Sequence, residues 1–311
     1  MAEHNHRCAV LGKPIAHSLS PTLHNAAYRA LALDDWFYDK HEVGETDLEG
    51  FLKTLNPQWA GLSLTMPLKK TIQPYGNPSD TWSEELHVAN TAVFDWAGTC
   101  RNGDENLPLI RLYNTDVKGI ELAFDHSYRA RGLRTEDVRR TNAVIIGNGN
   151  TATSALAACI EMSVEHVTVV ARNPGKNPEL KPLADRHLGE GAIEFTSMGQ
   201  AVNMLSRTDV AINTIPGLAA DGVAEQLLKQ TENVNGTLLD VVYDPRPTRL
   251  MQAWRARGGT AIGGEEMLLY QALAQVRLMT GPHDGDSAND EDSHLNETLE
   301  HSMRSALEEA L

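Results

Sequence analysis

The sequence Val-Ile-Ile-Gly-Asn-Gly-Asn-Thr-Ala, residues 144–152, decides the fold class of this chain. Residues 142–146 form a run rich in β-formers, and Gly147, Gly149 and Ala152 then match G-x-G-x-x-G/A at a strand-to-helix turn. Small residues there allow a tight turn, close approach of backbone N–H groups to a pyrophosphate, and close helix–strand packing. The N-terminus of the following helix adds a positive partial charge. A structural glycine-rich turn would also fit the glycines alone, but the strand and helix in register favour a dinucleotide site.

The next apolar run, 167–170, predicts a parallel strand that ends beside Arg172. In this motif an acidic residue about 20 positions on binds the ribose 2′-hydroxyl, whereas an arginine accommodates a 2′-phosphate. Arg172, with Lys176 as a second cation, therefore predicts NADP(H) as the cofactor.

The bulk properties exclude several classes of protein. A chain of 311 residues is long enough for two domains with separate cores. No apolar run approaches about 18 residues and Met1–Arg7 is polar, so we expect neither a membrane span nor a signal peptide. The isolated Cys8, Cys100 and Cys159 suit reduced thiols in a cytoplasmic protein, and the histidines lack metal-ligand spacing, which predicts no metal. The formal net charge of −15 argues against nucleic acid as a partner.

Alternation of apolar runs and helical patterns predicts an α/β protein of two domains. In the first domain, strands are predicted at 7–11, 36–43, 59–64, 87–96 and 109–113, the last two as an antiparallel pair around an Asn102-Gly103 turn. Helix starts are predicted at Ser20-Pro21, at a Thr46/Glu49 capping box and at Thr115-Asp116. In the second domain, strands at 142–146, 166–171, 192–196, 209–213, 237–242 and 260–262 alternate with helices, which indicates a doubly wound parallel sheet. We expect a substrate-binding and catalytic domain over 1–115, completed by a helix over 264–281, and a Rossmann-type dinucleotide-binding domain over 116–263.

The C-terminal segment 282–311 differs from the rest of the chain because it carries nine acidic residues against one arginine. We expect an acidic tail with a frayed, solvated terminus that is dispensable for turnover. The alternative is a short amphipathic helix, since Leu295, Leu299, Met303 and Leu307 recur every four residues.

Four polar clusters in the first domain each lie where a strand meets a loop or helix. They are Ser18 with Ser20, Thr65 with Lys69, Asn90, and Asp116. Each has an ordinary interpretation on its own: a helix cap for Ser20 or Asp116, a solvated surface lysine, a turn asparagine. Together they supply the hydroxyl, amide, ammonium and carboxylate groups that a polyhydroxylated substrate needs, and a hydride-transfer reaction also needs a group that moves a proton.

Nine motifs, in order, resemble those of the shikimate dehydrogenase family over about residues 7–281. They are Gly12-Lys13-Pro14-Ile15-Ala16-His17-Ser18-Leu19-Ser20-Pro21 with His24-Asn25, Gly61-Leu62-Ser63-Leu64-Thr65-Met66-Pro67-Leu68-Lys69, Ala89-Asn90-Thr91, Asn114-Thr115-Asp116, Gly147–Thr153, Arg172, Asn213-Thr214, Asp240-Val241-Val242-Tyr243 and Met267-Leu268-x-x-Gln271-Ala272.

The resemblance implies a role for each matching residue. Ser18 and Ser20 would hold a substrate carboxylate, Thr65, Asn90 and Gln271 would bind hydroxyls with Tyr243 closing the pocket, and Lys69 and Asp116 would be the catalytic pair. Cofactor contacts would come from Gly147, Asn148, Gly149, Asn150, Thr151, Ala152, Arg172, Lys176, Thr214 and Met267.

The activity implied by the resemblance is the NADP-dependent interconversion of 3-dehydroshikimate and shikimate, an oxidoreductase step of chorismate and aromatic amino-acid biosynthesis, in a cytoplasmic monomer or homodimer. The alternatives are a quinate/shikimate dehydrogenase of related specificity and a non-catalytic sensor of a shikimate-like ligand or dinucleotide. Two motifs depart from the family pattern: Ser63 replaces a commoner Asn before the Thr65 loop, and Ala171-Arg172-Asn173 replaces the commoner Asn-Arg-Thr.

Overall fold

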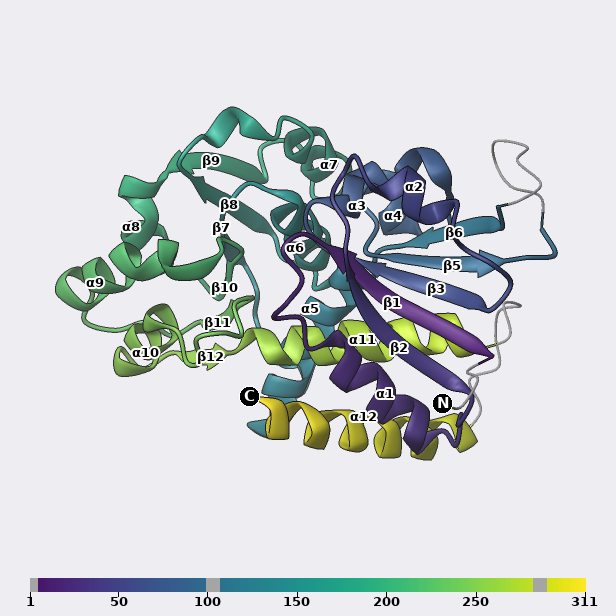
Figure 1. Cartoon of the computed structure of the whole chain (residues 1–311). Coiled ribbons are helices and arrows are strands. Elements are labelled where there is room, and N and C mark those ends of the chain that lie inside the picture. The colour runs from purple at the N-terminus through teal and green to yellow at the C-terminus, as the bar shows by residue number, and fades with distance from the viewer. Residues whose placement is uncertain (1–4, 99–106, 282–289) are drawn as a thin grey trace. The chain divides into compact units, whose positions relative to one another are not determined.

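A computed structural model describes residues 5–98, 107–281 and 290–311 of the chain (Figure 1). The predicted Asn102-Gly103 turn lies outside these residues. The chain divides into two compact units, the first running to Thr115 and resuming at Gln271, the second spanning Asp116–Tyr270. The divisions fall in the first turn of helix α5 (Thr115–Ala130) and within helix α11 (Gly264–Thr280). The assignment of these units to substrate and dinucleotide binding stays a prediction.

The first unit is built on a mixed sheet of six strands in the order β2-β1-β3-β5-β6-β4. Its elements are β1 (His6–Gly12), α1 (Ser20–Ala30), β2 (Trp36–Glu42), α2 (Leu48–Leu52), β3 (Trp59–Leu64), α3 (Leu68–Thr71), β4 (Asn77–Pro78), α4 (Thr81–Leu86), β5 (Thr91–Asp95), β6 (Leu109–Tyr113) and α12 (Asp290–Ala310). The central β1 is parallel to β2 and β3, and β5 is antiparallel to β3 and β6. Because side chains alternate across a strand, Leu62 and Leu64 of β3 join the core that contains α2 and α3. Gly61 and Ser63 therefore face α11, and a Cβ on Gly61 would come within 2.9 Å of Met279.

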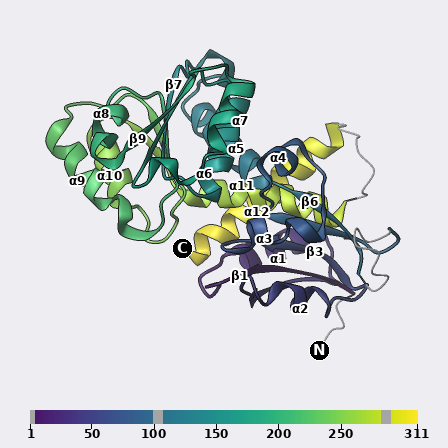
Figure 2. The same cartoon turned by 90° about the horizontal axis from the view of Figure 1, so that it is seen from above.

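The expectation of a frayed C-terminus is wrong, and the alternative of an amphipathic helix is confirmed. Helix α12, yellow in Figures 1 and 2, lies along α1. Leu299, Met303 and Leu307 are buried at relative exposures of 3%, 0% and 2%. Because they are spaced every four residues, these side chains form one apolar stripe on α12, and the stripe is buried only when it packs against α1.

The second unit contains a wholly parallel sheet in the order β12-β11-β10-β7-β8-β9. Besides α5 and α11, its elements are β7 (Asn142–Ile146), α6 (Asn150–Glu161), β8 (His166–Ala171), α7 (Leu180–His187), β9 (Ile193–Ser197), α8 (Ala201–Leu205), β10 (Val210–Asn213), α9 (Asp221–Gln230), β11 (Thr237–Asp240), α10 (Arg249–Ala256) and β12 (Thr260–Ile262). Helices α6 and α7 lie on one face, and α8, α9 and α10 lie on the other (Figure 1). This is the strand order of a Rossmann fold, whose chain reversal between β7 and β10 opens a ligand crevice at the carboxyl ends of the strands. The predicted doubly wound sheet is confirmed.

Helix starts were predicted less well than strands. Ser20 is the first residue of α1 and not its cap, since the capping position is Leu19 and no side chain caps the helix. The Thr46/Glu49 capping box is wrong, because α2 begins after Asp47, whose carboxylate instead accepts the Gly44 N–H. A capping box that the sequence reading missed joins Asp80 and Ser83 at the start of α4.

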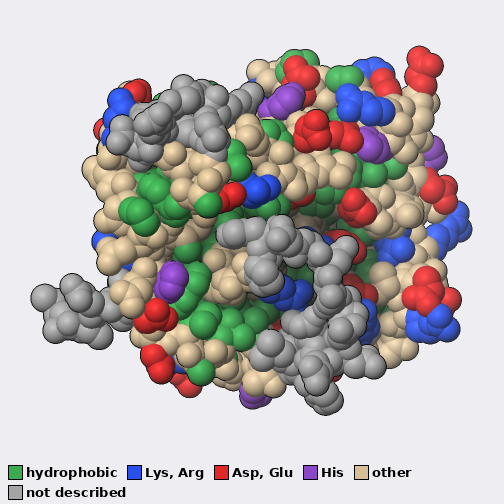
Figure 3. Space-filling view, turned by 90° about the vertical axis from the view of Figure 1, so that its right-hand side faces the viewer, with side chains coloured by type: hydrophobic (Ala, Val, Ile, Leu, Met, Phe, Trp, Pro, Cys, Tyr) green, Lys and Arg blue, Asp and Glu red, His purple; other side chains and the backbone are tan. Residues whose placement is uncertain are grey.

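No helix in the described ranges is both long and apolar enough to cross a bilayer. Acidic and basic side chains are interspersed on the face shown in Figure 3, so the negative net charge does not gather into one patch on that face.

Candidate active site

The glycine motif lies at the carboxyl ends of β7 and β10, where the fold places a ligand crevice. Gly147 has a φ of +117°, and a Cβ on it would come within 2.3 Å of the Thr214 hydroxyl oxygen. Thr214 is held there because its N–H and its hydroxyl both donate to the Ile146 carbonyl at 2.8 Å. Gly149 precedes α6, and nothing lies within 4 Å of a Cβ built on it. A side chain is therefore excluded at Gly147, and the helix N-terminus is left open beside Gly149, which fits a dinucleotide pyrophosphate.

The predicted 2′-phosphate residues follow β8 on a segment that is tied to the glycine motif. Arg172 and Lys176 are exposed. The Asn148 amide nitrogen donates to the carbonyls of Asn173 at 3.3 Å and Pro174 at 2.9 Å. These bonds fix the middle residue of the glycine loop to the backbone that presents both cations. Asn148 stays a predicted cofactor contact, and its amide nitrogen also binds this neighbouring segment.

A second asparagine strengthens the same connection. The buried Asn177 donates through its amide to the Thr153 hydroxyl on α6 at 3.0 Å. The segment from Asn173 to Asn177 is thus held at both ends against the glycine loop and its helix.

The other predicted residues of the second unit follow the same sheet or lie on its helices. Met267 on α11 and Ala152 on α6 are buried, whereas Asn150 and Thr151 are half-buried at the start of α6. Tyr243 is half-buried in the loop after β11, and burial raises the pKa of its phenol, with nearby Asp244 adding to the effect.

That loop is anchored by Asp240, the last residue of β11. Its carboxylate accepts from the Asn213 amide at 2.8 Å and from the Thr248 hydroxyl at 2.7 Å. Burial raises the pKa of Asp240, while these hydrogen bonds oppose the rise. Asp240 in this way joins the ends of β10 and β11 to the start of α10, at the edge of the sheet that carries Thr214.

Asp116 lies in the first turn of α5 and is 1% exposed. A carboxylate in the first turn is stabilised by the helix dipole. Asp116 follows Thr115, whose N–H donates to the Asn90 side-chain oxygen at 2.8 Å.

In the first unit, backbone hydrogen bonds bring the predicted substrate-binding segments together. The Thr65 N–H donates to Leu11 at 2.9 Å, the Leu64 N–H to the Asn90 carbonyl at 2.7 Å, and the Ala89 N–H to the Lys69 carbonyl at 2.9 Å. Thr65 and Lys69 are half-buried, whereas Asn90 is 2% exposed.

The Asn90 amide is the centre of this group. Its nitrogen donates to the Thr115 hydroxyl at 3.0 Å and to the Gln271 side-chain oxygen at 3.3 Å. Asn90 just before β5, Thr115 on α5 and Gln271 on α11, although distant in sequence, therefore form one polar group.

Ser18 and Ser20 lie where β1 leads into α1. The Ser20 N–H donates to the Ser18 hydroxyl at 3.4 Å, and Ser20 is buried whereas Ser18 is half-buried. One turn further on, His24 is fully buried and its Nδ1 lies 2.9 Å from the Ser20 carbonyl. Because a carbonyl can only accept, His24 carries its proton on Nδ1. Burial lowers the pKa of His24 to about 4, so the imidazole is neutral.

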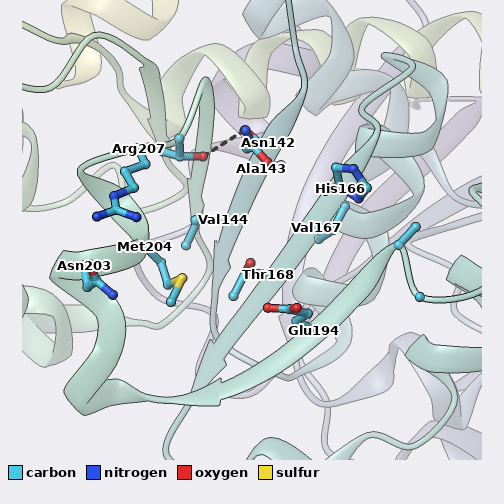
Figure 4. A pocket seen from close by; sticks show the side chains of 13 residues that line it. Asn142, Ala143, Val144, His166, Val167, Thr168, Glu194, Asn203, Met204 and Arg207 are labelled. Carbon is cyan, nitrogen blue, oxygen red and sulfur yellow. Dashed lines mark hydrogen bonds between the residues drawn. The ribbon is translucent and has the colours of Figure 1, made fainter.

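A cavity of about 320 Å³ lies at the opposite edge of the second sheet, by the amino ends of β7 and β8 (Figure 4). It is lined by polar, exposed side chains such as His166, Glu194 and Arg207. None of the predicted site residues lines it, and ligands of Rossmann folds bind at the other edge of the sheet. The predicted cofactor residues therefore lie away from this cavity, at the carboxyl edge of the sheet.

The two α/β units, the glycine motif at the carboxyl ends of β7 and β10, and the polar group around Asn90 define a two-domain α/β dehydrogenase. Residues 10–92 match the family described as the shikimate dehydrogenase substrate binding domain. The shikimate dehydrogenase (NADP(+)) of Methanosarcina barkeri is 30% identical over 281 residues, which cover 88% of this chain and 91% of the relative. The crystal structure of Mycobacterium tuberculosis shikimate dehydrogenase has a TM-score of 0.74 and 32% identity, covering 96% of this chain and 99% of that one. Thermus thermophilus shikimate 5-dehydrogenase, solved with NADP(H) and shikimate, has a TM-score of 0.71 and 25% identity, with coverage of 97% and 99%.

The chain therefore belongs to the shikimate dehydrogenase family, as its sequence motifs predicted.

Proposed function

We propose that this protein is an NADP-dependent shikimate dehydrogenase that interconverts 3-dehydroshikimate and shikimate. The observation that carries the proposal is that a member of this family retains Lys69 and Asp116 together with Arg172 at the carboxyl end of β8. A non-catalytic sensor would not need the ammonium and carboxylate of a proton-transfer pair.

NADP(H) fits the residues that are present. Gly147 adopts a backbone conformation that favours glycine, the start of α6 is open beside Gly149, and Arg172 is exposed. When bound, the cofactor exchanges a hydride with the substrate carbon. Arg172 and Lys176 would hold its 2′-phosphate through charge-assisted hydrogen bonds.

Lys69 is the proposed proton carrier. During reduction the substrate carbonyl oxygen gains negative charge, and the Lys69 ammonium stabilises that oxygen and transfers a proton to it. During oxidation, neutral Lys69 takes the proton from the same hydroxyl. Asp116 orients Lys69 and accepts a hydrogen bond from a substrate hydroxyl.

The remaining polar residues orient the ring. Ser18 and Ser20 donate hydroxyl hydrogen bonds to the carboxylate, and Thr65, Asn90 and Gln271 bind the hydroxyls. The carboxylate keeps its charge throughout the reaction, so these contacts contribute mainly to uniform binding.

A dehydrogenase screen that crosses NADP⁺ and NAD⁺ with shikimate and quinate tests the proposal by absorbance at 340 nm. We expect the highest kcat/KM for NADP⁺ with shikimate. A higher kcat/KM for quinate would instead show a quinate/shikimate dehydrogenase. Binding of shikimate without any turnover would show a non-catalytic sensor.

We further propose that the protein is cytoplasmic and acts as a monomer or homodimer on a small-molecule substrate. Cys8 and Cys159 are both buried free thiols, which suits a reducing compartment. Light scattering coupled to gel filtration distinguishes the two assembly states.

A further inference from the structure

A chain of buried side-chain hydrogen bonds runs through the first unit beneath the proposed substrate site. The Tyr38 hydroxyl donates to Ser63 Oγ at 2.6 Å, and Ser63 Oγ donates to Gln275 Oε1 at 2.9 Å. Gln275 Nε2 in turn donates to Thr91 Oγ1 at 3.0 Å and to the Asn90 carbonyl at 3.3 Å. Each of these side chains is at most 4% exposed, so every bond replaces one that water would otherwise make.

The chain ends at the Asn90 side chain and sets its direction. Thr91 Oγ1 donates to Asn90 Oδ1 at 2.9 Å, and the Thr115 N–H donates to the same oxygen at 2.8 Å. With two donors on the oxygen, the Asn90 amide nitrogen must point the other way, toward Gln271. Donors and acceptors run in one consistent order from Tyr38 to Asn90, because Thr91 can donate to Asn90 while it accepts from Gln275.

Gln275 also belongs to the helix that carries Gln271. The two residues are one turn apart on α11 and therefore lie on the same face. The hydrogen bonds of Gln275 to Ser63 on β3 and to Thr91 on β5 fix that face of α11 against the sheet.

The position of Ser63 fits this arrangement. Ser63 departs from the commoner Asn of the family motif, and its side chain is short. Gln275 extends from α11 to supply the amide on this side of the sheet, 212 residues away in sequence.

We propose that Gln275 is a positioning residue for substrate recognition. It does not touch the substrate, but it holds the Asn90 amide and the Gln271 turn in the arrangement that binds the ring hydroxyls. This inference rests on the proposed function.

The test compares Gln275→Leu with the unaltered protein in steady-state assays with shikimate and NADP⁺. Leu has a similar volume but donates to neither the Thr91 hydroxyl nor the Asn90 carbonyl. The Thr91 hydroxyl that donates to Asn90 Oδ1 is then no longer held in place, so Asn90 is oriented less firmly. We expect KM for shikimate to rise about tenfold, the effect of losing about one buried hydrogen bond, while KM for NADP⁺ changes less than about twofold.

Thr91→Val is a milder second variant, since it keeps the shape of the side chain and removes the hydroxyl that links Gln275 to Asn90 Oδ1 and lies 3.4 Å from the Thr115 hydroxyl. It should raise KM for shikimate in the same direction, and combining it with Gln275→Leu should add little because both act on one chain of bonds.

Ser83→Ala is the matched control. Ser83 is fully buried in the same unit and its hydroxyl donates to the Leu112 carbonyl at 2.8 Å, so its loss lowers the melting temperature without altering KM for shikimate.

Unaltered KM for shikimate in folded Gln275→Leu, or in folded Thr91→Val if the first variant does not fold, would overturn the positioning role. Absence of turnover and of shikimate binding in the unaltered protein would instead refute the proposed function, so the two failures are distinguishable.

Discussion

The buried His24 makes the stability of the first unit depend on pH in a way that one substitution can isolate. Its ring is fully buried and stacks on Tyr38 with the ring centroids 3.9 Å apart. His24 also packs edge-on to Tyr28, with the ring centroids 6.4 Å apart, and burial raises the pKa of both Tyr28 and Tyr38. Neither phenol can therefore supply a negative charge to a protonated imidazole.

The size of the effect follows from the change in pKa. Burial lowers the pKa of His24 from an ordinary 6.5 to about 4. Between these values the unfolded chain binds a proton at His24 that the folded chain does not bind. The contribution of neutral His24 to the free energy of unfolding should therefore be complete above about pH 6.5. About 3 kcal/mol of this contribution should be lost as the pH drops to about 4.

Urea denaturation of the unaltered protein and of His24→Gln, each between about pH 7 and about pH 4, measures this contribution. Every tryptophan except Trp254 belongs to the first unit, so tryptophan fluorescence reports mainly on that unit. Glutamine does not titrate, so the unaltered protein should lose about 3 kcal/mol more than His24→Gln over this range. Parallel loss of stability in the two proteins would show that His24 does not carry the effect.

Three further predictions concern the proposed chemistry, the cofactor and the C-terminal helix. Lys69→Ala should lower kcat by about 10²–10⁴ with a smaller change in KM, and Asp116→Asn should lower kcat less than Asp116→Ala because it keeps the hydrogen bonding; initial rates at 340 nm measure both. Arg172→Ala should weaken NADP⁺ binding about ten- to hundredfold and NAD⁺ binding much less, and Asn148→Ala should act in the same direction but more weakly, as measured by titration calorimetry. Met303→Ala should lower the free energy of unfolding by about 2–5 kcal/mol, seen in urea denaturation, and leave kcat unchanged.

Each of these predictions has an outcome that contradicts it. A raised KM with unaltered kcat in Lys69→Ala would mean that Lys69 only binds the substrate electrostatically. Equal loss of both cofactors in Arg172→Ala would remove the specificity role. A Met303→Ala protein as stable as the unaltered one would mean that the packing of α12 on α1 is not needed for stability.

Local signals in the sequence were sufficient to predict the second unit. Short apolar runs alternate there with helical patterns, and Gly147 and Gly149 mark the turn from β7 into α6. Each of these signals is contained within about ten residues, so no long-range information is required.

Features that depend on distant partners could not be predicted in the same way. The burial of Met303 in α12 needs the face of α1, and its acidic surroundings in the sequence favour a solvated tail. The Thr46/Glu49 pattern matched a capping box, but the backbone places Asp47 at the capping position. Side-chain partners such as Asn148 and the Pro174 carbonyl meet only once the loop after β8 has its conformation.

Both departures from the family pattern occur where a neighbouring side chain takes part in holding the motif. At Ser63 the neighbouring side chain is Gln275. At Asn173 it is Asn148, which donates to the Asn173 backbone carbonyl. That hydrogen bond does not depend on which side chain residue 173 carries. A substitution inside a motif therefore need not weaken the site, provided that the hydrogen-bond network around it remains complete. In this chain the side-chain hydrogen bonds around Asn90 and around the Arg172 segment are present despite the two departures.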